Sequence, residues 1–178
     1  MPESTLELTL LPADAAETLL ADLAELLRAC VQDGASVGFV LPYAPADAQA
    51  YWRAKVLPGV AAGTLALWVA RLDGRVAGSV QLDCDMPPNQ PHRAELRKLL
   101  VHPDFRRRGL ARALLREAEA MAARRGRSLI TLDTRTGDKA EPLYASAGYR
   151  TAGRIPGFSR DPRDPSRLDA TTVMYKQL

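Results

Sequence analysis

Cysteine is scarce in this chain of 178 residues, which holds only Cys30 and Cys84. The two lie far apart, they form no C-x-x-C pair, and no cluster of histidines accompanies them. A disulfide framework or a zinc site would need more cysteines or closer spacing. We therefore expect two buried free thiols in a cytoplasmic protein, and no bound metal.

Long apolar runs are missing as well. No stretch approaches the roughly 20 apolar residues that a membrane-spanning helix needs. The first residues, Met1–Ser4, lack the basic start and apolar core of a signal peptide. These absences predict a soluble protein that is not exported and has no membrane partner.

Charge of one sign is not in large excess. The chain has 24 lysines and arginines against 21 aspartates and glutamates, a formal net charge of +3. A nucleic-acid-binding module would show a stronger basic excess together with stacking aromatic residues. We therefore expect no nucleic-acid partner, although the mild basic excess suits an anionic ligand.

The chain does contain enough apolar residues, 47%, for a substantial core, and its length favours one domain over residues 1–178. Hydrophobic periodicity predicts the positions of strands and helices. Strands are expected at residues 5–11, 64–71, 75–83, 94–101, 129–133, 149–154 and 170–175. Helices are expected from Asp14, with Glu17 completing a capping box, to a stop at Gly34, and at residues 47–60, 109–125 and 139–146.

Two local features predict how these elements connect. Asp73-Gly74 lies between two predicted strands and is a strong hairpin signal. The strand at 94–101, the helix at 109–125 and the strand at 129–133 form a crossover unit, so the two strands should be parallel. The fold class is therefore α/β (α+β), with a mixed central sheet of about six to seven strands flanked by about four helices.

The stretch from Val101 to Ala111 is the most informative in the chain. It joins a predicted strand to a predicted helix through three arginines, a glycine and a small residue. Gly109 lets the backbone approach a ligand closely, and the first N–H groups of the helix are unpaired at the positive end of its dipole. The stretch therefore predicts a diphosphate site. Neither the G-x-x-x-x-G-K-[ST] loop nor the G-x-G-x-x-G fingerprint is present.

The remaining pattern, Arg106-x-x-Gly109-x-Ala111, resembles the R/Q-x-x-G-x-G/A signature of the GNAT acetyltransferases. Leu143-Tyr144-x-x-x-Gly148-Tyr149 follows it in the order typical of that superfamily. The resemblance implies a single-domain GNAT fold and acetyl-coenzyme A (acetyl-CoA) as co-substrate. The implied cofactor-binding residues are Leu99, Leu100, Val101, Arg106, Arg107, Arg108, Gly109, Leu110, Ala111 and Arg112.

The sequence departs from the family pattern in two places. Ala111 replaces the last glycine of the signature, which the pattern tolerates. The asparagine that many relatives carry before the tyrosine helix is missing, and Gly137 or Asp138 occupies its place. The second departure removes one contact to the cofactor that the family would otherwise imply.

The same resemblance implies three catalytic residues. Acetylation of an amine requires that an ammonium with a pKa of about 10 loses a proton, and a departing thiolate gains from an acid. Tyr144 is implied as that acid, with a packing role as the alternative. Glu95 and Asp133 are both candidates for the base. Their alternative roles are, for Glu95, an exposed partner of Arg93, Arg97 or Lys98 and, for Asp133, a cap for the turn at Thr134.

Further blocks resemble a narrower group, the tabtoxin-resistance acetyltransferases. In that group the acceptor is the amino group of a β-lactam amino acid, and carboxylates matching Glu95 and Asp133 activate it. By the same resemblance, residues 35–43 and 156–160 would line the acceptor pocket. The blocks are residues 34–39, 67–69, 93–95, 98–99, 132–134, 156–158 and 161–162.

The predicted function is thus an N-acetyltransferase that moves the acetyl group of acetyl-CoA directly to a primary amine of a small molecule. An amino-acid-like compound or a β-lactam antibiotic or toxin is the acceptor implied by resemblance. Neither cysteine lies in a motif typical of a nucleophile, which disfavours an acyl-enzyme. The alternatives are a protein or peptide N-acetyltransferase and a non-catalytic acyl-CoA sensor. The protein is expected to be a monomer or a homodimer.

Overall fold

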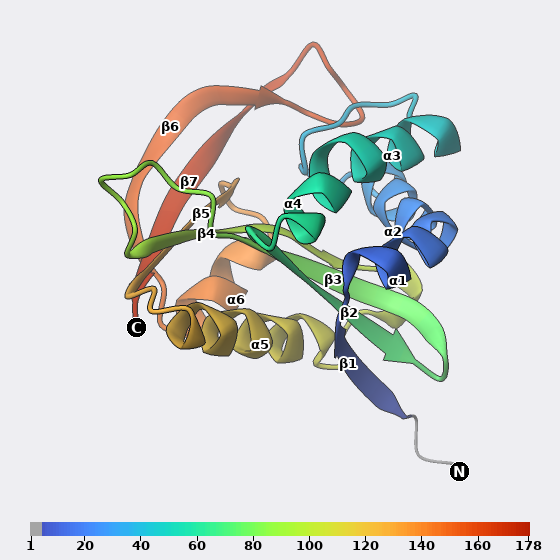
Figure 1. The fold of residues 1–178 in the computed structure, drawn as a ribbon. Helices are drawn as coiled ribbons and strands as arrows, with labels where there is room; N and C mark the ends of the chain where they lie inside the picture. Colours follow the sequence, from blue (N-terminus) through green and yellow to red (C-terminus); the bar gives the residue numbers. More distant parts are fainter. Residues whose placement is uncertain (1–4) are drawn as a thin grey trace.

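Seven strands form one mixed sheet in the structure, a computed structural model that describes residues 5–178 (Figure 1). Met1–Ser4, which carry the expectation about a signal peptide, lie outside the described residues. The order across the sheet is β1-β2-β3-β4-β5-β7-β6. Only β4 and β5 are parallel neighbours, as the crossover predicted. The strands are β1 (Leu6–Leu10), β2 (Leu65–Leu72), β3 (Arg75–Asp83), β4 (Arg93–Val101), β5 (Leu129–Arg135), β6 (Arg150–Arg160) and β7 (Leu168–Gln177).

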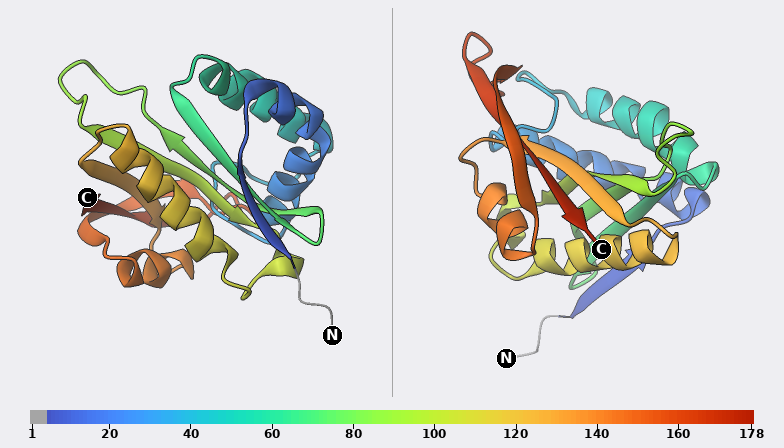
Figure 2. Two further views of the ribbon diagram at one scale, coloured as in Figure 1. Left: turned by 60° about the horizontal axis from the view of Figure 1, so that its bottom comes forward. Right: turned by 90° about the vertical axis from the view of Figure 1, so that its left-hand side faces the viewer.

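The helices follow one another in four nearly continuous stretches on the two faces of the sheet (Figure 2). The first two stretches cover one face, and α5 and α6 cover the other. No described helix is long and apolar enough to cross a membrane. The stretches are α1 (Ala13–Thr18) with α2 (Leu20–Gln32); α3 (Pro45–Tyr51), the π-helical turn η1 (Trp52–Val56) and α4 (Leu57–Ala61); α5 (Leu110–Arg124); and α6 (Ala140–Ser146).

Two expectations about local structure are wrong. The first helix begins at Ala13 after an extended Pro12, so Asp14 lies inside the first turn and caps nothing. The strand predicted at residues 149–154 is longer than expected, because β6 continues to Arg160 through a bulge. Three residues, 156–158, lie opposite a single residue of β7 between the pairs Ile155↔Thr171 and Ser159↔Asp169. The bulge lets β6 pass a proline that has no N–H to donate.

The hairpin between β2 and β3 confirms the prediction from Asp73-Gly74. Both residues have positive φ, 52° and 79°, as a two-residue turn that matches the strand twist requires. β3 pairs on its other side with β4, with Gly78 opposite Val101. The hairpin therefore adjoins β4, the strand that leads into the predicted diphosphate site.

A bulge in β4 changes which face its side chains occupy. Ala94 and Leu96 belong to the core under α5, whereas Leu100 belongs to the core under α2. Strict alternation would put all three on one face. Arg97 pairs with Gln81 and Leu100 with Ser79, so two residues of β4, Lys98 and Leu99, oppose the single Val80 of β3. Lys98 adopts φ 47° to make this bulge.

The close approach of β3 to β4 predicts the effect of one substitution. A Cβ at position 78 would lie 2.8 Å from the carbonyl oxygen of Leu100 and 3.1 Å from Leu114 Cδ1. Gly78→Ala should therefore lower the free energy of unfolding by about 1–3 kcal/mol, measured by urea denaturation. Gly153→Ala is the matched control, since nothing lies within 4 Å of its added Cβ. Equal midpoint shifts for the two variants would contradict a steric role for Gly78.

Candidate active site

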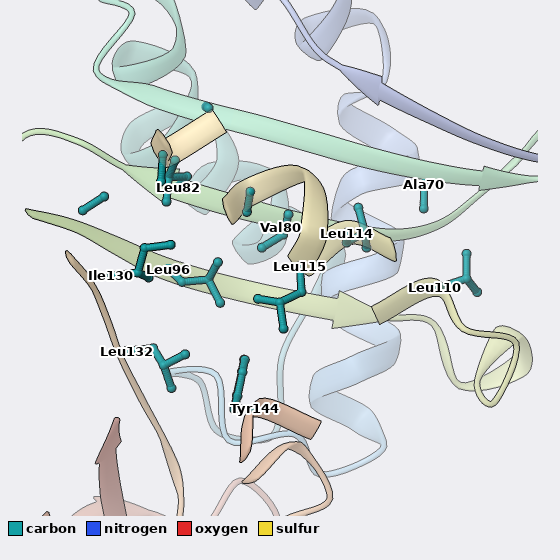
Figure 3. Close-up of a cluster of buried hydrophobic side chains, with 14 of the residues drawn as sticks. Ala70, Val80, Leu82, Leu96, Leu110, Leu114, Leu115, Ile130, Leu132 and Tyr144 are labelled. Carbon is teal, nitrogen blue, oxygen red and sulfur yellow. The ribbon is translucent and has the colours of Figure 1, made fainter. Parts of the chain in front are cut away.

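The sheet opens between β4 and β5. The two strands pair only from Arg93↔Leu129 to Glu95↔Thr131, although β4 continues to Val101 and β5 to Arg135. Beyond these pairs the two strands are no longer joined, and we call the gap between their backbones the notch. Figure 3 shows Leu96 and Leu132 on either side of this region, with Tyr144 of α6 lying near them. The C-terminal ends of parallel strands are the usual place for a ligand in such a sheet.

The turn between β4 and α5 presents free backbone N–H groups to this notch. Arg107 and Gly109 have positive φ, 62° and 80°, and Gly109 forms the N-cap of α5. An added Cβ at Gly109 would meet nothing within 4 Å. Glycine is therefore favoured here by its positive φ, and the space beside it is open. Within the part of the chain that the structure describes, none of the N–H groups of residues 107–112 donates a hydrogen bond. Together with the dipole of the 15-residue α5, they can hold an anion.

The three consecutive arginines of the turn differ in their contacts. Arg106 forms an ion pair with Asp33, at the end of α2, and also donates to the carbonyl oxygen of Val101 at 3.4 Å. Its side chain therefore stabilises the turn. The predicted binding of the cofactor by Arg106 stays a prediction, and it now concerns the main chain of this residue. Arg107 and Arg108 are exposed, and the Arg108 guanidinium lies 5.7 Å from the centre of the Phe105 ring. These two cations remain free to approach a bound anion.

Glu95 and Asp133 lie on the same face of the sheet. Their neighbours Ala94, Leu96 and Leu132 are buried in the core under α5, so alternation directs both carboxylates to the opposite face. Glu95 is half-buried, 3.0 Å from Arg97 and 4.0 Å from Arg93, the ion pairs that its alternative role predicted. The exposed Asp133 accepts a 3.0 Å hydrogen bond from the Thr171 hydroxyl. The structure therefore brings both predicted carboxylates to the mouth of the notch.

Tyr144 approaches the notch from the other face. It is 6% exposed and belongs to the core under α5, so it also has the packing role considered for it. Burial raises the pKa of its hydroxyl well above the usual range, and the charge of Asp133 raises it further. Tyr149 is buried beside it in the same core, with the two ring centres 5.6 Å apart.

The loops predicted to line an acceptor pocket meet in the structure. A hollow of about 190 Å³ is lined by Ser36, Gly38, Phe39, Val40, Ser159 and Arg160, which come from both loops. The N–H of Leu41 donates to the carbonyl oxygen of Pro162 at 2.9 Å and joins the first loop to the β6–β7 connection. Asp161 fixes that connection, because its carboxylate accepts hydrogen bonds from the N–H groups of Arg163 and Asp164.

Sequence reasoning missed one charged residue of the site. Lys98 was considered only as a partner for Glu95, but its ammonium lies 5.8 Å and 5.5 Å from the ring centres of Phe39 and Tyr51. The sequence carried no signal for this role, because Lys98 follows Arg93, Glu95 and Arg97 as one of several charged residues of the strand. The aromatic residues come from a loop and a helix that are distant in sequence, so only the folded chain shows this arrangement.

The chain is similar in sequence to known proteins. The sequence matches the profile of the Acetyltransferase (GNAT) family over residues 20–149. An uncharacterized N-acetyltransferase of Azospirillum brasilense is 33% identical over 144 residues, which cover 78% of this chain and 83% of that protein. N-acetyltransferase 8 of Homo sapiens is 37% identical over 89 residues, 49% of this chain and 39% of that protein. The chain thus spans well under half of the human relative.

Solved structures share the fold at low sequence identity. A Salmonella typhimurium protein described as an acetyltransferase, with its cofactor acetyl-CoA, superposes with a TM-score of 0.75 at 19% identity. The alignment covers 97% of this chain and 94% of that one. A GCN5-related N-acetyltransferase from Kribbella flavida gives a TM-score of 0.76 at 22% identity, over 97% and 98% of the two chains. These likenesses confirm the predicted fold, a mixed seven-stranded sheet with helices on both faces.

The raised pKa of Tyr144 predicts how stability depends on pH. The phenol stays protonated in the folded protein but ionises near pH 10 once the chain unfolds, so its contribution is complete below pH 10 and decreases above it. The free energy of unfolding of wild type should therefore fall faster than that of Tyr144→Phe above pH 10, by up to about 1.4 kcal/mol per pH unit. Denaturant titrations from pH 8 to pH 11.5 measure this difference. Parallel curves over the whole range would refute it.

Proposed function

The chain belongs to the Acetyltransferase (GNAT) family, and from this premise we propose that it transfers the acetyl group of acetyl-CoA directly to a primary amine of a small molecule. The observation that carries the proposal is the notch between β4 and β5. It has free N–H groups at one end, two carboxylates on one face of the sheet and a protonated tyrosine on the other. Each of these groups matches a requirement of the reaction.

The residues around the notch fit acetyl-CoA. The unpaired N–H groups of residues 107–112 and the start of α5 suit its diphosphate, with Arg107 and Arg108 adding positive charge. The segment Leu99–Val101 runs along the notch beyond the last residue of β4 that pairs with β5, so its backbone would hold the extended arm of the cofactor. When bound, acetyl-CoA supplies an activated acetyl thioester, and the protein has to position it, remove a proton and return one.

Proton transfer is divided between the two faces of the sheet. A carboxylate takes the proton of the acceptor ammonium, directly or through water, and Asp133 suits this role because, among residues 5–178, it forms no ion pair with an arginine or lysine and accepts a hydrogen bond only from the Thr171 hydroxyl. Glu95 is held by two arginines and helps to bind the ammonium. Burial raises the pKa of Tyr144 and keeps its hydroxyl protonated, so this hydroxyl can donate a hydrogen bond to the departing sulfur as negative charge develops there and supply the proton that the thiolate takes up.

A small acceptor is favoured by the loops over the site. Residues 35–44 and the β6–β7 connection are joined by the hydrogen bond from Leu41 to Pro162, and the hollow between them measures about 190 Å³. A β-lactam amino acid, the acceptor implied by the narrower sequence resemblance, is one member of the class that such a hollow suits. A peptide acceptor would need a longer open groove along these loops.

A panel of amines tests the proposed function. We expect thiol release from acetyl-CoA with at least one small amine among amino acids, tabtoxinine-β-lactam, polyamines and aminoglycosides. Turnover with N-terminal peptides alone would replace the proposal with peptide acetylation. Tight binding of acetyl-CoA without turnover of any acceptor would identify a non-catalytic acyl-CoA sensor.

Cofactor binding should depend on the start of α5. Ala111→Glu places a carboxylate in the first helical turn, where it suits the helix dipole but repels a diphosphate, so we expect the Kd for acetyl-CoA to rise at least tenfold. Ala123→Glu, an exposed position in the last turns of the same helix, should leave the Kd within about twofold. Isothermal titration calorimetry measures both values. Equal affinities would place the diphosphate elsewhere.

Catalysis should depend on the Tyr144 hydroxyl. Tyr144→Phe removes one oxygen atom and should lower kcat by about 100-fold, the usual contribution of a positioned acid, while the Kd for acetyl-CoA stays within a few fold. Tyr149→Phe removes the same atom from the neighbouring buried ring and should change kcat little. Steady-state kinetics with the best acceptor of the panel compares the two. Similar losses in both variants would indicate a packing effect.

A further inference from the structure

Lys98 occupies an unusual position in the site. The β4 bulge holds its backbone at φ 47°, a conformation that is uncommon for a side-chain-bearing residue. The bulge brings its ammonium beside the rings of Phe39 and Tyr51, on the sheet face that also carries Glu95 and Asp133. Strained backbone of this kind persists where the surrounding structure requires it and is often part of a functional site.

The charges on this face leave two groups uncompensated. Glu95 pairs with two arginines, and Arg97 also lies 2.8 Å from Asp83. Lys98 forms no ion pair with a carboxylate within the described part of the chain, and its ammonium lies beside two aromatic rings. Asp133 has a single hydroxyl donor, Thr171, and no cationic partner in the same part. One positive and one negative charge therefore remain, both beside the notch.

The lysine lies beside residues that line a hollow. A Cβ added to Gly38 would lie 3.7 Å from the Lys98 ammonium, which is an ordinary van der Waals distance, and the Phe39 ring lies beside the same ammonium. Gly38 and Phe39 both line the 190 Å³ hollow. Burial lowers the pKa of Lys98, whereas the charges of Asp133 and Glu95 raise it. A partly buried ammonium without a carboxylate partner gains strongly from an anionic ligand.

We propose that Lys98 and Asp133 together recognise a zwitterionic acceptor, with the carboxylate of a free amino acid at Lys98 and its ammonium at Asp133. This inference rests on the proposed function and specifies its substrate class. Lys98 acts as a specificity-determining residue, because it binds a part of the acceptor that does not react. Polyamines and aminoglycosides, which lack a carboxylate, and peptides, which have none next to the reacting amine, would leave Lys98 unpaired.

The test compares amino acids with their carboxamides, which keep the amine and lose the negative charge. Wild type should prefer the acid at least tenfold in kcat/KM. Lys98→Met should lose at least tenfold on the acid and change less than threefold on the carboxamide, so the preference disappears. Lys98→Arg keeps the positive charge and should therefore retain part of the preference for the acid. Lys55→Met, the same substitution at an exposed lysine of η1, should behave as wild type.

Two kinetic results would overturn the inference. One is a wild type that acetylates carboxamides or peptides as well as the acids, and the other is an unchanged preference in Lys98→Met. Circular dichroism of each variant separates loss of recognition from loss of folding.

A binding measurement decides the case in which no amine is acetylated. Such a result would refute the proposed function, but the Lys98 side-chain ¹⁵N signal, assigned by its absence from Lys98→Met, still reports recognition. A shift of that signal with the amino acids of the panel and not with their carboxamides would support the inference. The absence of a shift would refute it.

Discussion

The early end of the pairing between β4 and β5 is the constraint on which the site depends. After Glu95 and Thr131 the two strands no longer share hydrogen bonds, so the N–H and C=O groups on their facing edges lose this partner. On their other edges β5 pairs with β7 along its whole length and β4 pairs with β3. The edges that face the notch are thereby left for a ligand with its own amide groups. A sheet that paired fully at this point would have no room for the acetyl donor.

The bulge in β4 is the second element of this arrangement. Without it, Leu100 would face α5 and the strand could not contribute to both cores. The same bulge turns Lys98 toward the aromatic rings of the layer formed by α2 and α3. The packing of β4 against both cores and the proposed role of Lys98 in acceptor specificity therefore depend on the same bulge.

The sequence was sufficient for features encoded over short stretches. Asp73-Gly74 predicted its hairpin, and the run from Val101 to Ala111 predicted a strand, a turn with free N–H groups and a helix. It was insufficient where distant residues decide the outcome. The ion pair of Arg106 with Asp33 joins two segments far apart in the chain, and the continuation of β6 to Arg160 depends on β7 as a pairing partner. Register shifts such as the one at Lys98 leave no compositional signal, because they arise from the fit of two strands to two cores.

The separation of Asp133 and Tyr144 onto opposite faces of the sheet couples the two proton transfers of the proposed reaction. Burial, and to a smaller extent the charge of Asp133, hold the pKa of Tyr144 high, so the phenol is protonated in the free protein. In the proposed reaction Asp133 takes a proton from the acceptor, and the smaller of these two contributions then disappears. The phenol thus becomes a better donor at the stage when the thiolate departs. A tyrosine hydrogen-bonded directly to the base would lose this order, because its proton would already be shared with the carboxylate.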